Sequence, residues 1–268
     1  MNFLQALPKA KYAGRVLQLS DYTASLAPTP SKVYLEYKVP LQLWEMLGND
    51  SVGDCEIARI AHMLMLFTAH TGKMVTPTLA EVMAAYSAIS GYDPLQTQPD
   101  GSNPTDVGCN TEDVLEYWRT TGIAGHKILA WVKTAPTQEA IKQAIYLFGG
   151  AALDIAVYQW MMDQFSGHQP WDIPELAARP WWKKIIEPVS AAPLLGYHAV
   201  PFFGFGSDGI TGVTWGALQS MGWPTALSIM QNNYAVITQD WIDAATEKTP
   251  SGFDLAQLQA DLEALKGA

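Results

Sequence analysis

Basic residues are scarce in this chain. Its 268 residues include 16 lysines and arginines against 26 aspartates and glutamates, for a formal net charge of −10. A protein that holds nucleic acid neutralises phosphate groups with lysine and arginine, so this charge argues against a nucleic-acid partner. The same reasoning argues against binding to an anionic membrane surface. We therefore expect neither nucleic acid nor a membrane as a partner.

Long apolar runs and cysteines are scarce too. No run reaches the roughly 18 residues that a membrane-spanning helix needs. The first 20 residues lack a continuous apolar core followed by small residues, so we expect no secretory signal peptide. The chain has two cysteines, Cys55 and Cys109, which are too few for a disulfide framework. These features favour a cytoplasmic protein, although release by cell lysis stays open.

The remaining composition is that of a folded protein, with 49% hydrophobic and 16% charged residues. Helical patterns dominate the first half and strand patterns the second, which predicts an α+β fold. The patterns predict helices at about 55–71, 78–89, 111–120 and 136–148, a hairpin at 198–216, a strand at 232–242 and a loop-rich, tryptophan-rich segment at 159–192. We expect four segments: an extended N-terminal arm at 1–35, a helical lobe at 36–140, a β-rich lobe at 141–245 and a C-terminal amphipathic helix at 246–268.

Cys55 occupies a position that favours reactivity. It follows the polar turn 49-NDSVGD-54 and opens an apolar helix, with Asp54 as the expected N-cap. Unpaired N–H groups and the positive end of the helix dipole lie at such a position, and both lower the pKa of a thiol. A cysteine nucleophile also needs a base, which the fold brings from elsewhere in the chain. His198, which begins a predicted hairpin 198 − 55 = 143 residues later, is the candidate.

Four segments resemble, in order, motifs of the papain-like cysteine peptidases. The segment 49-NDSVGDC-55 is similar to Q-G-x-C-G-S-C, with Asn49 where the family has its oxyanion-hole glutamine. The segment 108-GCN-110 resembles the G-C-N-G-G loop, and 197-YHAV-200 resembles the segment around the catalytic histidine. The segment 214-TWG-216 resembles N-S-W-G. The resemblance implies a divergent member of bacterial or phage origin.

The implied fold has two lobes, a helical one with the cysteine-bearing helix at its centre and a barrel-like β-rich one. The implied reaction is hydrolysis of a peptide bond through a thiolate–imidazolium pair. Cys55 would attack the carbonyl carbon, His198 would move the proton, and Asn49 would stabilise the oxyanion. Thr214 would orient the imidazole of His198, and Trp215 would shield that contact from water.

The substrate implied is a peptide or protein, and Gly108, Asn110 and Trp215 are expected to help bind it. Neither a cofactor nor a metal is expected, because the cysteines and histidines lack zinc-site spacing such as C-x2-C or H-x3-H. His62 lies two helical turns beyond Cys55, about 10.5 Å along the axis, and is expected to be packed rather than catalytic. The sequence carries no signal for an oligomeric state.

Three departures from the family pattern leave alternatives open. Val52 replaces the family's disulfide partner of Cys109, and Asn49 is one methylene shorter than glutamine. The family has an asparagine that orients the histidine, but one alignment puts Val213 there and another Thr214. We choose Thr214, because valine cannot form a hydrogen bond. The alternatives are a catalytically inactive papain-fold binding or structural module, or a deamidase, amidase or transglutaminase with the same residues.

Overall fold

The computed structural model describes residues 16–22, 28–174, 193–245, 256 and 259–260. The α-helices are α1 (Cys55–His70), α2 (Leu79–Ser90), α3 (Thr111–Thr120), α4 (Gln138–Phe148), α5 (Gln159–Ser166), α7 (Trp223–Ile229) and α8 (Gln239–Ala245). The strands are β1 (Val33–Tyr34), β2 (Ala130–Lys133), β3 (Ala151–Tyr158), β4 (Leu194–Phe205), β5 (Gly209–Thr214), β6 (Ala217–Gly222) and β7 (Met230–Ile237).

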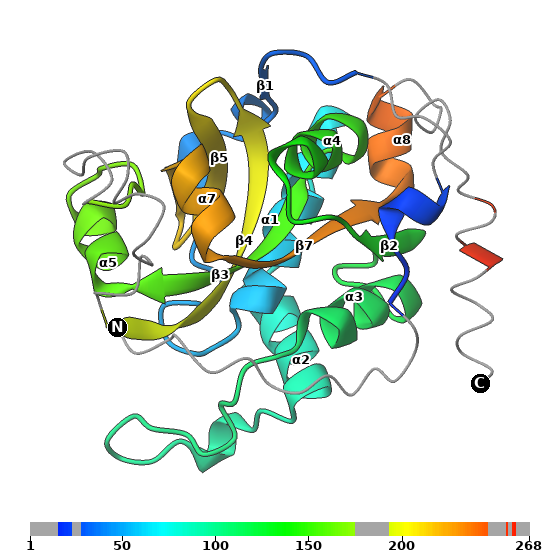
Figure 1. Ribbon diagram of the computed structural model, residues 1–268. Coiled ribbons are helices and arrows are strands. Elements are labelled where there is room, and N and C mark those ends of the chain that lie inside the picture. The colour runs from blue at the N-terminus through cyan, green and yellow to red at the C-terminus, as the bar shows by residue number, and fades with distance from the viewer. Residues whose placement is uncertain (1–15, 23–27, 175–192, 246–255, 257–258, 261–268) are drawn as a thin grey trace.

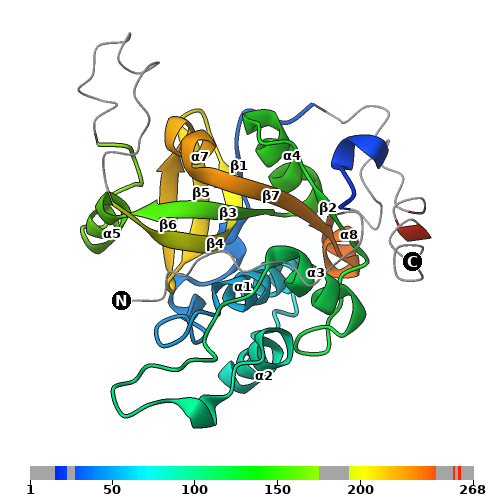
Figure 2. The same ribbon diagram turned by 60° about the horizontal axis from the view of Figure 1, so that its bottom comes forward.

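The strands form one seven-stranded sheet in which every pairing is antiparallel. The order is β2-β7-β3-β4-β5-β6, and β1 pairs with the C-terminal end of β4. Helix α1 packs on β4, and α2 and α3 pack on α1 (Figure 1). Figure 2 shows these three helices on one side of the sheet and α4 and α7 on the other. The predicted α+β class is confirmed.

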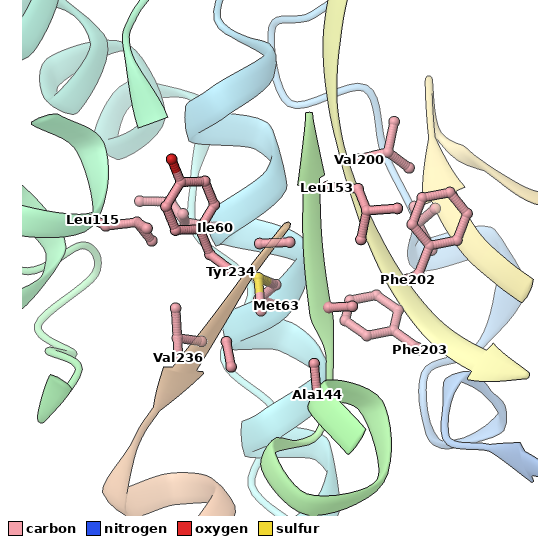
Figure 3. Close-up of a cluster of buried hydrophobic side chains, with 14 of the residues drawn as sticks. Ile60, Met63, Leu115, Ala144, Leu153, Val200, Phe202, Phe203, Tyr234 and Val236 are labelled. Carbon is pink, nitrogen blue, oxygen red and sulfur yellow. The ribbon is translucent and has the colours of Figure 1, made fainter. Parts of the chain in front are cut away.

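Helix α1 is the central element of the molecule. Thirteen of its sixteen residues are buried, as its apolar pattern on all sides predicts. Figure 3 shows Ile60 and Met63 of this helix in one cluster with apolar side chains of β3, β4 and β7. Burying each such side chain stabilises the fold by about 1.5–3 kcal/mol, so the helix that begins at Cys55 is firmly held against the sheet.

Helix ends follow the expected local chemistry. Thr78 caps α2 through a reciprocal capping box with Glu81, and the helix ends at Gly91 with a φ of +86°. Thr137 caps α4 through a single hydrogen bond, which its side chain accepts from the N–H of Ala140. Gly149 ends that helix with a φ of +81°. These signals explain why the predicted helices at 78–89 and 136–148 are confirmed to within two residues at each end.

The boundaries of the predicted segments differ from the structure in several places. Strand β2 lies inside the range assigned to the helical lobe, yet it pairs with β7 in the sheet. In the predicted N-terminal arm, residues 19–22 form a short 3-10 helix and 33–34 form β1. The predicted strand at 232–242 ends at Ile237, because Thr238 accepts a hydrogen bond from the backbone of Trp241 and starts α8.

Parts of the prediction fall on residues outside those described. These are most of the predicted C-terminal helix at 246–268, residues 1–15 and 23–27 of the predicted arm, and 175–192 of the tryptophan-rich segment. In the described part of the tryptophan-rich segment, residues 159–166 form α5 rather than a loop. Among the helices described, none is long and apolar enough to cross a bilayer.

Candidate active site

Cys55 is the first residue of α1, and Asp54 is the N-cap, as predicted. The thiol is free and the residue is half-buried. Loss of hydration raises the pKa of the Cys55 thiol to about 12, and the neighbouring negative charge of Glu56 adds to this rise. A backbone hydrogen bond from Ala199 and the charge of Arg59 oppose it. Burial therefore outweighs the helix terminus, and the resting thiol is protonated.

His198 lies on β4 directly opposite Ile155 of β3, and its side chain is buried. Its Nε2 atom is 2.7 Å from the Oγ1 atom of Thr214. Its Nδ1 atom has no hydrogen-bond partner among the described residues. His198 and Cys55 line one small pocket, with a volume of about 10 Å³. A histidine held through Nε2 and open at Nδ1 can accept a proton from a group in that pocket.

Burial also sets the charge of His198. It lowers the pKa of the imidazole to about 3, and the positive charge of Arg59 lowers it further. The sequence predicts a thiolate–imidazolium pair, but these surroundings favour a neutral thiol beside a neutral imidazole. The difference arises because both groups lie in one desolvated pocket, where charging either of them loses hydration.

Trp215 covers His198 on one face. The two rings are stacked, with centroids 4.6 Å apart and planes 16° apart. Trp215 and Gly216 join β5 to β6 in a two-residue turn, with φ values of +45° and +72°. Positive φ at both positions is what a type I′ hairpin turn requires, and it is uncommon for tryptophan. A side chain at Gly216 would lie 3.1 Å from the carbonyl oxygen of Trp44, so glycine fits the turn best.

Asn49 also lines the pocket of Cys55 and His198, but its amide already has a partner. Its Nδ2 group donates a hydrogen bond of 3.3 Å to the carbonyl oxygen of Val52. A primary amide has two N–H donors, and this amide also opposes the rise in the pKa of the neighbouring Asp54. The oxyanion role of Asn49 stays a prediction.

Gly108 and Asn110 do not line this pocket. Gly108 has a φ of +73°, and its N–H donates a 3.0 Å hydrogen bond to the hydroxyl of Tyr86. The side chain of Asn110 caps α3 by accepting from the N–H of Glu112 at 2.9 Å. Both residues thus shape the loop before α3, and their role in substrate binding stays a prediction.

A buried ionic cluster lies one turn below Cys55, and the sequence analysis missed it. Arg59 donates to Asp154 Oδ1 at 2.7 Å and also pairs with Glu56. The hydroxyl of Thr111 contacts Glu56 at 2.9 Å and Asp154 at 2.8 Å. The cluster joins α1, α3 and β3 next to Cys55. Its sequence signal is a Glu–Arg pair three residues apart in a helix that is otherwise apolar.

The burial of the Asp54 side chain is a second feature that the sequence analysis missed. Its side chain is fully buried, and neither carboxyl oxygen has a hydrogen-bond partner among the described residues. Burial raises the pKa of Asp54 well above its usual range, whereas the nearby amide of Asn49 opposes the rise. Burial therefore disfavours the charged form of the Asp54 carboxyl group, directly before Cys55.

Two other residues keep the packed positions expected of them. His62 is buried, and its Nε2 lies 2.9 Å from the carbonyl oxygen of Glu45. Burial lowers the pKa of His62 to about 4. Cys109 is buried beside the start of α3. In the described part of the chain, no three His, Cys, Asp or Glu side chains are grouped as metal ligands.

Comparison with solved structures identifies the fold. No protein-family model matches the sequence, and no curated protein matches it significantly. Xylellain, a cysteine protease from Xylella fastidiosa, is 12% identical with a TM-score of 0.59, over 88% of this chain and 96% of its own. A cysteine protease from Carica candamarcensis, in complex with E-64, is 13% identical with a TM-score of 0.50, over 78% and 99%.

Procathepsin B from Trypanosoma congolense is similar as well. It is 11% identical with a TM-score of 0.53, over 87% of this chain and 86% of its own. Identities this low show the fold and not the activity. The chain therefore has the papain-like fold that its motifs predict.

Proposed function

We propose that the protein is a cysteine-type hydrolase that cleaves peptide bonds. The observation that supports this most is the meeting of Cys55, at the start of the central helix, with His198 in one pocket. The contact of His198 Nε2 with Thr214 adds support, because Nδ1 is left without a hydrogen-bond partner among the described residues. Nucleophile, base and orienting group are the three parts that thiol-dependent acyl transfer needs.

The reaction begins from the neutral pair. The Cys55 sulfur attacks the substrate carbonyl carbon while its proton passes to Nδ1 of His198. The backbone N–H of Cys55 and the side-chain amide of Asn49 stabilise the oxyanion. The imidazolium then gives its proton to the leaving amine, and the C–N bond breaks to leave a thioester. Water activated by His198 hydrolyses the thioester and regenerates the thiol.

The test is covalent labelling together with product analysis. E-64, which the Carica candamarcensis protease binds, should add once to Cys55, as intact mass and peptide mapping would show. Cys109→Ser should label normally, and Cys55→Ser should not label. A peptide library should yield new termini with the wild type and none with Cys55→Ser. Release of ammonia or formation of cross-links without cleavage would instead indicate a deamidase, amidase or transglutaminase.

One observation favours a second candidate, an inactive binding module. The pocket at Cys55 holds about 10 Å³, and burial raises the pKa of the thiol to about 12. Both features oppose attack on a substrate unless substrate binding opens the pocket. Absence of labelling and of cleavage in a correctly folded protein would support the binding module over the hydrolase.

A further inference from the structure

The segment between α2 and α3 leaves the body of the protein and returns to it. Figures 1 and 2 both show it projecting beyond the helical side. Its outer part is held by its own hydrogen bonds, such as Asn103 to the carbonyl oxygen of Asp93 at 2.8 Å. The segment returns to the body at Asp106, close to the residues that precede Cys55.

Asp106 connects three separate parts of the helical side. Its two carboxyl oxygens accept from the N–H of Gly53 at 3.0 and 3.2 Å. Its Oδ1 also accepts from the hydroxyl of Tyr86, which lies on α2. The Tyr86 oxygen in turn accepts from the N–H of Gly108 at 3.0 Å. One carboxylate thus links the loop before the nucleophile, α2 and the loop before α3.

The loop before Cys55 otherwise folds on itself. Ser51 and Val52 donate their N–H groups to the carbonyl oxygen of Gly48, and Asn49 donates to Val52. Such bonds fix the shape of the loop but not its position relative to α2. The bond from Gly53 to Asp106 fixes that position, and a bond to a charged acceptor is about twice as strong as a neutral one.

We propose that Asp106 is a positioning residue of the active site, which holds Gly53 and Gly108 in place so that Cys55 and Asn49 face the substrate carbonyl. This inference rests on the proposed function. The backbone N–H of Cys55 follows Gly53 by two residues, and a misplacement of 1 Å can slow a reaction about 100-fold. The position of the loop therefore matters to rate as well as to stability.

Charge supports the same role. Burial is the main reason that the pKa of Asp54 is raised, and the negative charge of Asp106 adds to it. Disfavouring the charged form of Asp54 favours the thiolate of Cys55, because the charge of Asp54 raises the pKa of that thiol. Burial and the bond to Asp106 both raise the pKa of Tyr86, so its hydroxyl stays a donor.

The experiment compares Asp106→Asn with Asp100→Asn in the full chain. Asp100 lies in the same projecting segment, but it is exposed and bonds only locally to Ser102. The readouts are hydrogen exchange of residues 49–55, the rate of Cys55 alkylation in a Cys109→Ser background, and kcat and KM separately. Exchange and alkylation need no substrate.

We expect Asp106→Asn to speed exchange of 49–55 at least fivefold and to slow Cys55 alkylation by a similar factor. It should lower kcat more than it raises KM, while Asp100→Asn matches the wild type. If Asp106→Asn fails to fold, Tyr86→Phe is the second variant. It removes the link from Asp106 to α2 and Gly108 but keeps the bond from Gly53 to Asp106, so it should give the same changes at smaller size.

Equal exchange and equal alkylation in the Asp106 and Asp100 variants would overturn the proposal. So would a loss of global stability that leaves kcat and the Cys55 reaction rate unchanged, because that is a purely structural role. Failure of the proposed function looks different. In that case the wild-type Cys55 reacts no faster than Cys55 in His198→Ala, while hydrogen exchange still reports whether Asp106 holds the loop.

Discussion

The Nε2 atom of His198 lies 2.7 Å from the Oγ1 atom of Thr214. The residue pair spans two adjacent strands, β4 and β5, and it puts a hydroxyl where the papain-like motif has an asparagine. An amide oxygen can only accept, whereas a hydroxyl can accept or donate. When Oγ1 accepts from Nε2–H, Nδ1 is bare and can take a proton. The opposite tautomer would place a hydrogen on Nδ1, where the base is needed.

Thr214→Val removes this hydroxyl and keeps the shape of the side chain. We expect kcat/KM to fall by about fivefold, since a hydrogen bond contributes about 1 kcal/mol. Thr214→Ser is the matched control and should keep most of the activity. An activity of Thr214→Val equal to that of the wild type would show that packing against Trp215 is enough to orient His198.

His62 should make the fold sensitive to acid. Burial lowers its pKa to about 4 in the folded protein, while the unfolded chain has the ordinary value near 6.5. Between these values the unfolded state binds more protons, so the free energy of unfolding falls as pH falls through this range. The loss attributable to His62 is on the order of 3 kcal/mol.

Urea unfolding of the wild type and of His62→Gln at pH 7, 5.5 and 4 measures this contribution. Glutamine can still donate to the carbonyl oxygen of Glu45 but does not titrate in this range. As pH falls, we expect the free energy of unfolding to decrease more in the wild type than in His62→Gln. A constant difference at all three pH values would contradict the assignment.

Arg59 should be essential to stability. Its guanidinium group is buried between Glu56 and Asp154, so Arg59→Met leaves two carboxyl groups without their cation. We expect a loss of about 3–5 kcal/mol in the free energy of unfolding. In a double-mutant cycle, Arg59→Met with Asp154→Asn should be more stable than Arg59→Met alone. Additive losses would show that the pair is not coupled.

The structure also predicts a disulfide that the natural chain lacks. The N–H of Gly53, the neighbour of Val52, donates to Asp106, and the N–H of Gly108, the neighbour of Cys109, donates to Tyr86. Asp106 and Tyr86 are hydrogen-bonded to each other. The papain-like motif has cysteines at the positions of Val52 and Cys109. We expect Val52→Cys in a Cys55→Ser background to lose both thiols on mild oxidation. Two thiols that stay titratable would place the Cα atoms beyond the roughly 4.4–6.8 Å that a disulfide allows.

The local chemistry of the sequence predicted most helices and the hairpin of β4 and β5. Thr78 and Thr137 are capping residues whose effect depends on near neighbours alone. Strand β2 was missed because its four residues carry no alternation, and its partner β7 lies about a hundred residues away. Pairings of that range depend on the whole fold and leave no local pattern.

The candidate site was predictable in its residue types but not in its charges. Ordered motifs indicated Cys55, His198 and Thr214, and the structure brings these three together. The buried Arg59 and Asp54 and the partly buried Asp106 have no motif, because each acts through a contact with a segment far along the chain or through burial. The neutral state of the Cys55–His198 pair depends on burial as well, which a sequence pattern does not measure.

The most direct test of the central claim is the alkylation rate of Cys55 between pH 4 and 10, in a Cys109→Ser background, with and without His198→Ala. If His198 is the base of Cys55, the intact protein should react about 100-fold faster at pH 7 than His198→Ala. Its rate should show no step near pH 6.5, because burial lowers the pKa of His198 to about 3. Identical profiles for the two proteins would contradict the account, since Cys55 would then react without His198.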